Sequence, residues 1–344
     1  MAGPDSPHEP PSRSTDPRIG RWRAWLDRLS GASGTSLGVA LGADAVVGVA
    51  RSGEAHGKPR ISGLHVVPCG ATPASRLAGL RAVAAALGRG RTTLVLPPDS
   101  YELHQVSAPP VPAEELREAV RWQLRGLMRV APAEAVLDIA ELPTLGGGGK
   151  AVLAAVAPLA EVDELCDLCE RAGLTLGAVD IPEFAVRNVA PVRSDAPTGF
   201  LAFEPDGALL TLQRDGMLLF ARRMALPALT STDADAAGPS IQRLVSQVVR
   251  TLDLFERQAG CGHAARVTIA PHRTAHTLAP QLADRAAVAT DIYDPLDLLA
   301  IAPRAAAQLA HTPAALLALG AALRPDGAAA RTATAAAATS ANAD

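Results

Sequence analysis

Two cysteines separated by two residues, Cys166-Asp-Leu-Cys169, are the first group in this sequence whose spacing could support chemistry. A reactive pair of this kind lies at the N-terminus of a helix that follows a strand, where the environment favours a thiolate. Here the pair falls inside a predicted helix, residues 158–172, with Leu165 and Leu168 beside it. No second pair and no neighbouring histidine completes a zinc site. The sequence therefore predicts that both cysteines are buried and structural.

Two further motifs have a superficial likeness to ligand sites. His272 and His276 are four residues apart and close to His263, but no carboxylate stands between them as in the zinc motif H-E-x-x-H. The glycine run at residues 146–149 precedes Lys150, but it lacks the P-loop spacing and a strand is predicted after it. We therefore expect surface histidines, a flexible hairpin turn and no metal site.

A basic segment, residues 18–29, contains two of the three tryptophans. As a helix it would place Trp22, Trp25 and Leu26 on one side and most of its arginines on the other. Such a segment could lie on an anionic membrane surface as a peripheral contact. It could instead pack on the rest of the chain or on a partner, and the sequence leaves both interpretations open.

Composition limits the class of protein. The chain has 344 residues, of which 48% are hydrophobic but only 3% aromatic, so a large core must consist of Ala, Leu and Val. The net charge of -3 argues against a nucleic-acid partner, because phosphate binding needs a basic field. Four cysteines are too few for a disulfide framework. No stretch resembles a transmembrane helix or a signal peptide, so we expect a soluble, cytoplasmic protein.

The elements predicted for the first half alternate between strands and helices. Strands at 37–41 and 45–50 form a hairpin around Gly42, and a third strand follows at 61–67. The helix that begins at Pro112 carries an apolar stripe of Leu116, Val120, Leu124 and Leu127. The other expected helices are 73–87, 158–172 and 182–189, and the other strands are 92–96, 103–108, 136–142, 151–157 and 174–181.

The second half repeats this plan. Strands at 199–203, 209–213 and 217–225 form a meander, and a linker is expected at 230–239. The later elements are helices at 239–258, 274–284, 295–309 and 313–323 and a strand at 266–270. Each half thus begins with a β-meander and continues with helices and strands, which predicts an α/β protein with mixed sheets. The low-complexity ends, residues 1–17 and about 325–344, are expected to be disordered.

The order and spacing of several segments resemble the actin-like (ribonuclease H-like) ATPase fold, and within it the pilus-assembly family of PilM and MshI. Ser36-Leu-Gly-Val-Ala-Leu-Gly42 is similar to the first phosphate hairpin of that family, and Pro112 to Leu124 to its inserted helix. The run from Gly173 to Val189 is similar to the segment that closes the first half. The resemblance implies a duplicated fold in four parts: a tail with a short amphipathic helix at 1–34, a first half at 35–190 with a small insert at about 110–157, a second half at 191–324, and a tail at 325–344.

The resemblance also locates a nucleotide site that has lost its essential groups. An ATPase of this fold holds Mg-ATP between two hairpins, each of which supplies a carboxylate near the metal. The first hairpin has Gly38, Ala40 and Gly42, with Ala40 at the position of the expected aspartate. The second hairpin has Glu204 and Asp206 around a proline, and Pro271 replaces a glycine of the adenosine loop. These losses predict no catalysis and no bound cofactor, and they favour MshI over PilM.

The resemblance implies a scaffold in the inner-membrane platform of an MSHA-like type IV pilus. Its expected partners are the cytoplasmic tail of a bitopic, PilN-like protein and other platform components. Candidate contacts lie on the inserted helix: Leu116, Val120, Arg121, Trp122 and Leu124. Trp122 lies off the apolar stripe, and its position is equally compatible with exposure and with burial. The alternative is an ATP-binding ATPase in which Glu204 and Asp206 hold the metal.

Overall fold

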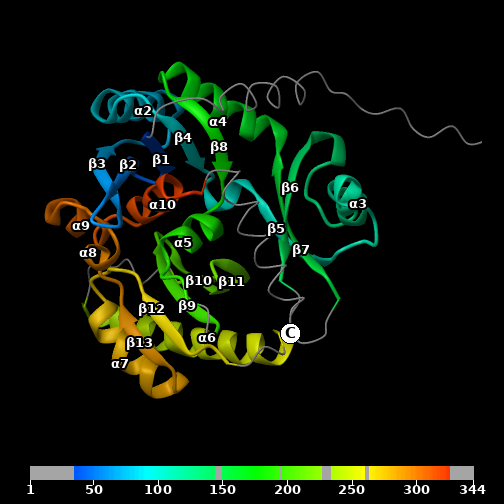
Figure 1. Cartoon of the computed structure of the whole chain (residues 1–344), viewed down its shortest axis with the longest axis vertical. Coiled ribbons are helices and arrows are strands. Elements are labelled where there is room, and N and C mark those ends of the chain that lie inside the picture. Colours follow the sequence, from blue (N-terminus) through cyan, green and yellow to red (C-terminus); the bar gives the residue numbers. More distant parts are fainter. Residues whose placement is uncertain (1–34, 144–148, 194–195, 227–233, 260–262, 326–344) are drawn as a thin grey trace, which may run out of the picture.

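A computed structural model describes residues 35–143, 149–193, 196–226, 234–259 and 263–325, and Figure 1 shows two sheets with helices between and around them. The first sheet has the order β3-β2-β1-β4-β8, in which the β1–β2–β3 meander is antiparallel and β4 and β8 run parallel to β1. Its strands are β1 (Thr35–Leu41), β2 (Ala45–Ala55), β3 (Lys58–Pro68), β4 (Arg91–Val95) and β8 (Thr175–Asp180). The helices of this half are α2 (Pro73–Leu87), α4 (Leu159–Arg171) and α5 (Pro182–Val189).

The second sheet repeats this topology strand for strand. Its order is β11-β10-β9-β12-β13, again with an antiparallel meander followed by two parallel strands. The strands are β9 (Thr198–Glu204), β10 (Gly207–Arg214), β11 (Met217–Ala225), β12 (Arg266–Ile269) and β13 (Ala289–Ile292). The helices are α6 (Ala234–Ala259), α7 (Ala275–Ala286), α8 (Pro295–Leu298), α9 (Pro303–Leu309) and α10 (Pro313–Ala322). The chain is therefore a duplicated α/β fold, as the sequence predicted.

The two halves are joined by α5 and α10, which cross between the two sheets (Figure 1). The last helix, α10, packs on β1 and β2 of the first sheet, whereas α5 packs on the second sheet. The helices meet where Gly320 faces Ala185, because a Cβ at Gly320 would lie 1.9 Å from the carbonyl oxygen of Ala185. Only glycine permits this approach, so the crossing depends on one residue.

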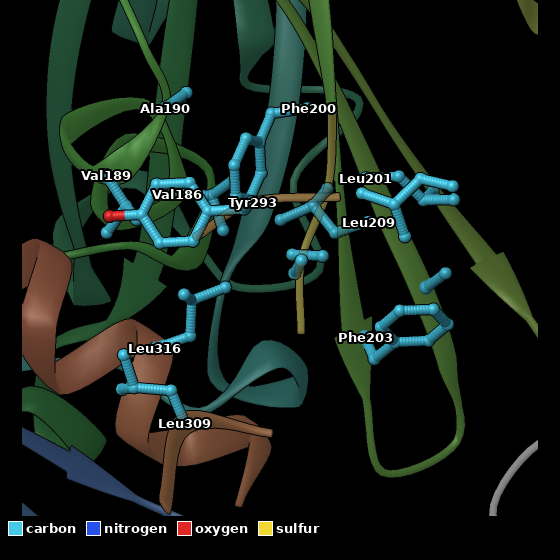
Figure 2. Close-up of a cluster of buried hydrophobic side chains, with 14 of the residues drawn as sticks. Val186, Val189, Ala190, Phe200, Leu201, Phe203, Leu209, Tyr293, Leu309 and Leu316 are labelled. Carbon is cyan, nitrogen blue, oxygen red and sulfur yellow. The ribbon is translucent and has the colours of Figure 1, made fainter. Parts of the chain in front are cut away.

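One hydrophobic core, the largest of several, extends across both halves. It includes Ala40 and Val47 of the first sheet, the buried face of α5, and the inner face of the second sheet. Figure 2 shows part of it, where Phe200 of β9 and Tyr293 meet edge to face with ring centroids 5.5 Å apart. Because this core is continuous, the halves bury apolar surface against each other.

A small third sheet, with the order β5-β7-β6, forms the insert. Its strands are β5 (Glu102–Ser107), β6 (Ala135–Leu142) and β7 (Ala151–Pro158), and α3 (Ala113–Leu124) covers one face. The insert therefore begins with β5, ahead of the boundary at about residue 110. The expected apolar stripe includes one wrong member: Leu127 lies beyond the end of α3 and is 64% exposed.

Three other local expectations need correction. The helix expected at 295–309 is two short helices, because Leu299–Ile301 leaves the helix and Ala300 bridges to Arg60 of β3. The linker expected at 230–239 is shorter, since α6 begins at Ala234. The four-residue strand β13 was not expected. The tails at 1–34 and 326–344, with their expected disorder, lie outside the described residues.

Candidate functional site between the two halves

The hairpin between β1 and β2 is packed against α10. A Cβ at Gly38 would lie 1.9 Å from the carbonyl oxygen of Ala318, so helix and strand are in direct contact there. A Cβ at Gly42 would lie 3.4 Å from the Cβ of Ala314. Ala40 is buried in the common core and has no side-chain oxygen. These three positions therefore serve the packing of α10 and offer no carboxylate to a metal.

The second hairpin joins β9 to β10 through Pro205 and Asp206, both of which are exposed. The backbone carbonyl of Asp206 accepts a hydrogen bond of 2.7 Å from the amide of Leu226. Glu204, the last residue of β9, is by contrast 7% exposed. The two acidic residues of this hairpin thus have different surroundings. Because Glu204 is buried, its carboxylate needs a cation or a hydrogen-bond donor beside it.

That partner is Arg223 of β11, at the centre of a group that we call the interhalf cluster: Tyr101, Glu183, Glu204 and Arg223. The Nε of Arg223 donates to both carboxylate oxygens of Glu204, at 2.9 and 2.7 Å. Its Nη2 lies 3.1 Å from Oε1 of Glu183 and donates to the hydroxyl of Tyr101 at 3.0 Å. Tyr101 in turn donates to Oε2 of Glu183 at 2.6 Å. Since Tyr101 and Glu183 belong to the first half, the cluster ties the two halves together.

Burial gives the interhalf cluster its strength. The side chains of Glu183 and Glu204 are 4% and 8% exposed, whereas that of Arg223 is 32% exposed. Burial raises the pKa of Glu204, although Arg223 opposes the shift. Burial and the charge of Glu183 also raise the pKa of Tyr101, so its hydroxyl keeps the proton that it donates. One guanidinium therefore serves two buried carboxylates, and its loss would leave both without a cation.

The loop after β12 packs against β9 through a stacked pair of rings. Pro271 and His272 follow the strand, and the ring of His272 stacks on Phe203 of β9 with centroids 4.0 Å apart. Nδ1 of His272 also lies 2.7 Å from the hydroxyl of Thr274. Burial, together with the charge of Arg273, lowers the pKa of His272 to about 4, so the ring is neutral at pH 7. The loop that would receive an adenosine in the resembled family thus contains proline and a stacked imidazole.

A second ion pair between distant parts of the chain lies at the end of β8. The Asp180 carboxylate is 4% exposed and lies 2.6 Å from Nη1 of Arg324, which follows α10. Its other oxygen accepts the amide hydrogen of Ile181 at 2.9 Å. The end of the last helix is thereby tied to the first sheet. Like the interhalf cluster, this pair holds together parts of the chain that are distant in sequence.

The candidate contact residues of the insert separate into two groups. Leu116, Val120 and Leu124 are 7%, 0% and 0% exposed and form the core between α3 and its sheet. Arg121 donates to the carbonyl oxygens of Pro132 and Ala135 at 2.7 and 2.9 Å, so its role in this fold is structural. Trp122 is 56% exposed, with the guanidinium of Arg125 5.8 Å from its ring centroid. Of the five candidates, Trp122 is the one whose ring a partner can reach.

The cysteine pair of α4 carries no reactive thiol. Cys169 is buried and Cys166 half-buried on α4, and burial raises the pKa of each thiol to about 12, so neither is a thiolate at pH 7. Among the described residues, no group of three or more His, Cys, Asp or Glu side chains could hold a metal ion. Trp22, Trp25 and Leu26 lie outside the described residues.

No single helix among the described residues is long and apolar enough to cross a membrane. The pair α9 and α10 reaches the limits of length and composition only when taken together, across a bend of 117°.

Sequence reasoning missed Tyr101, Glu183, Arg223, Asp180 and Arg324. Tyr101 is 122 positions from Arg223, and Asp180 is 144 positions from Arg324. No local spacing marks such pairs. The one available signal was an arginine in a strand next to the hairpin that carries Glu204.

The two repeated sheets, the crossed helices and the facing hairpins define the class: this is an actin-like ATPase fold. Among solved structures, the chain is similar to a chain of the PilM–PilN type IV pilus biogenesis complex. The two share 23% sequence identity with a TM-score of 0.68, over 84% of this chain and 99% of that chain. The likeness shows a common fold along almost the whole of that neighbour.

Two other solved structures are more distant. The cytoplasmic domain of EpsL, an inner-membrane component of the type II secretion system of Vibrio cholerae, has 10% identity and a TM-score of 0.45, over 68% of this chain and 81% of its own. A Bacteroides thetaiotaomicron protein described as having an actin-like ATPase fold and unknown function has 9% identity and a TM-score of 0.46, over 76% and 92%. No family model and no curated protein matches this chain.

Proposed function

We propose that this protein is a non-catalytic scaffold of a type IV pilus biogenesis platform. It acts in the cytoplasm, held at the inner membrane by the cytoplasmic tail of a PilN-like protein and in contact with other platform proteins. The observation that carries the pilus assignment is the shared fold with the PilM–PilN complex, at a TM-score of 0.68 over 99% of the matched chain. Within that class, the substituted hairpin residues favour the MSHA branch, to which MshI belongs.

The non-catalytic part of the proposal depends on which side chains lie where the two halves meet. Glu204 is the acidic residue best placed to hold a metal, but Arg223 neutralises it at 2.7 Å. A Mg²⁺ ion needs several oxygen ligands in near-octahedral geometry, and Ala40 supplies none on the facing hairpin. A nucleotide would have to break the interhalf cluster before its metal could use Glu204. The protein side chains thus take over the task of joining the two halves.

The competing function is an ATP-binding ATPase with substituted phosphate-site residues. Both hairpins and the crossed helices that frame a nucleotide in this fold are retained. In this alternative Glu204 and exposed Asp206 would hold the metal. Titration with Mg-ATP separates the two functions, because only the ATPase would bind the nucleotide saturably.

The surface that we assign to the membrane partner is the exposed end of α3 around Trp122. Large aromatic side chains with neighbouring arginines are the typical anchors of protein interfaces. Trp122 and Leu127 are 56% and 64% exposed, so both side chains are open to contact with a partner. Arg125 lies against the tryptophan and adds a cation to the same surface.

Replacing Trp122 by alanine should weaken binding of the partner's tail by about 1 kcal/mol or more, which is roughly a fivefold rise in Kd. The melting temperature should hardly change, because the ring is exposed. The measurement is a titration of the full-length protein with a peptide that carries the cytoplasmic tail of the host's own PilN-like protein.

The matched control is Leu124→Ala on the same helix. Leu124 is fully buried, so this change should cost about 2–5 kcal/mol of folding free energy. Equal binding of the tail by the wild type and by Trp122→Ala would refute the contact, and so would unfolding of Trp122→Ala without a selective loss of binding.

A further inference from the structure

A half-buried guanidinium lies near the crossing of α5 and α10, the two helices between the sheets in Figure 1. It belongs to Arg187 of α5 and stacks on the ring of Phe184, with its central carbon 4.9 Å from the ring centroid. Its Nε and Nη2 donate to Oδ1 of Asn188 at 3.3 and 2.8 Å. Nδ2 of Asn188 donates in turn to the carbonyl oxygen of Gly320 on α10 at 3.0 Å. The orientation of the Arg187 guanidinium is therefore set by contacts at the crossing.

One edge of this guanidinium has no acceptor among the described residues. Asn188 takes the edge formed by Nε and Nη2, which leaves both N–H groups of Nη1 and the second N–H of Nη2. No carboxylate of the described chain lies within ion-pair distance of Arg187. Glu183, one helical turn earlier, is taken by Arg223 and Tyr101. The open edge of Arg187 has the fork geometry that binds a carboxylate through two parallel hydrogen bonds.

The charges around Arg187 do not balance among the described residues. Burial lowers the pKa of the Arg187 guanidinium, the carboxylate of Asp180 opposes this shift, and the guanidinium of Arg324 adds to it. Asp180 already pairs with Arg324 at 2.6 Å, and its side chain is 4% exposed. These three side chains therefore carry two positive charges and one negative charge. Because a buried charge is normally paired, one singly charged anion would complete the group.

We propose that Asp180, Arg187, Asn188 and Arg324, which we call the crossing site, bind a carboxylate group of another molecule. The carboxylate occupies the open edge of Arg187, with the guanidinium of Arg324 beside it. The side chain of Arg324 is 41% exposed, so a ligand can approach the crossing site from the end of α10. This site is separate from the surface around Trp122 and does not depend on the pilus assignment.

The charge of the crossing site separates a carboxylate from a phosphate. A carboxylate carries one negative charge and neutralises the site. Inorganic phosphate is mostly a dianion at mildly alkaline pH, so it would leave excess negative charge beside the buried carboxylate of Asp180. We therefore expect acetate to bind more tightly than inorganic phosphate.

The test is an NMR titration of the full-length protein with labelled arginine side chains, in which sodium acetate replaces sodium chloride at constant ionic strength. The Nε–H signal of Arg187 should shift saturably with acetate. Arg187→Lys keeps the charge but loses the fork, so it should weaken acetate binding by about tenfold, as read from the signal of Arg324. Circular dichroism shows whether each variant is folded.

Asp180→Asn gives an independent comparison that leaves Arg187 unchanged. This variant removes the one negative charge of the crossing site, so it should bind acetate about tenfold more tightly and lose the preference for acetate over phosphate. Arg222, an exposed arginine in no ion pair with a described residue, is the control, and its signal should respond to acetate and chloride alike.

Two probes distinguish the sources of the carboxylate. Sodium acetate represents a free organic acid, and the capped peptide Gly-Glu-Gly represents an acidic side chain of a protein partner. Saturable binding of either probe that weakens in Arg187→Lys supports the crossing site, and the tighter probe identifies the source. An unsaturated shift like that of Arg222 would overturn the proposal, as would equal binding by the wild type and Arg187→Lys. Tighter binding of phosphate than of acetate would overturn the assignment to a carboxylate.

Discussion

Arg223→Met is expected to destabilise the protein by about 2–4 kcal/mol. The change leaves the carboxylates of Glu183 and Glu204 without their cation, and breaking a buried pair in this way costs about 3–5 kcal/mol. We take a lower value because the Arg223 side chain is 32% exposed, so water can enter the space it leaves. Urea denaturation followed by circular dichroism measures the loss.

Arg222→Met is the matched control, because Arg222 is the exposed neighbour on the same strand and makes no ion pair among the described residues. Its effect should remain within about 0.5 kcal/mol. A triple variant, Arg223→Met with Glu183→Gln and Glu204→Gln, should recover part of the loss, since it leaves no buried charge unpaired. If Arg223→Met were no more harmful than Arg222→Met, the interhalf cluster would not hold the halves together.

Gly320→Val should destabilise the fold by about 3 kcal/mol or more. Its Cβ would lie 1.9 Å from the carbonyl oxygen of Ala185, which is a backbone atom that no rotamer change can move. The two helices would have to separate, which opens the core between the halves. Thermal unfolding measures the effect, and hydrogen exchange should show faster exchange in α5 and α10.

Gly126→Ala is the control for this glycine. Gly126 is exposed near the end of α3, and a Cβ there would meet nothing within 4 Å. Its replacement should be neutral or slightly stabilising, because it lowers the entropy of the unfolded chain. A Gly320→Val protein as stable as the Gly126→Ala protein would mean that the close crossing of α5 and α10 is not required.

Local patterns in the sequence were sufficient to predict most elements of the fold. The meanders were visible in short apolar runs, and Leu116, Val120 and Leu124 predicted the buried face of α3 correctly. The prediction that Leu127 belongs to this buried face was wrong, because periodicity does not show where a helix ends. The strand β13 was missed because its four residues, Ala289–Ile292, alternate too briefly to form a pattern.

At the candidate site, the sequence showed only which residues expected of a nucleotide site are absent. Ala40 and Pro271 were recognisable as substitutions because the resemblance supplied the expected residues. Nothing in the sequence indicated that Arg223 would neutralise Glu204, since its partners come from three separate parts of the chain: Tyr101, Glu183 and Glu204. The exposure of Trp122 also needed the fold, because a tryptophan next to a buried stripe can lie on either side of its edge.

Calorimetric titration of the full-length protein with Mg-ATP tests the central claim most directly. If the protein's own side chains have replaced the nucleotide between the two halves, no saturable heat should appear up to millimolar ATP. Saturable binding with a micromolar Kd, equivalent to about 8 kcal/mol of binding free energy, would contradict the account and support an ATP-binding protein.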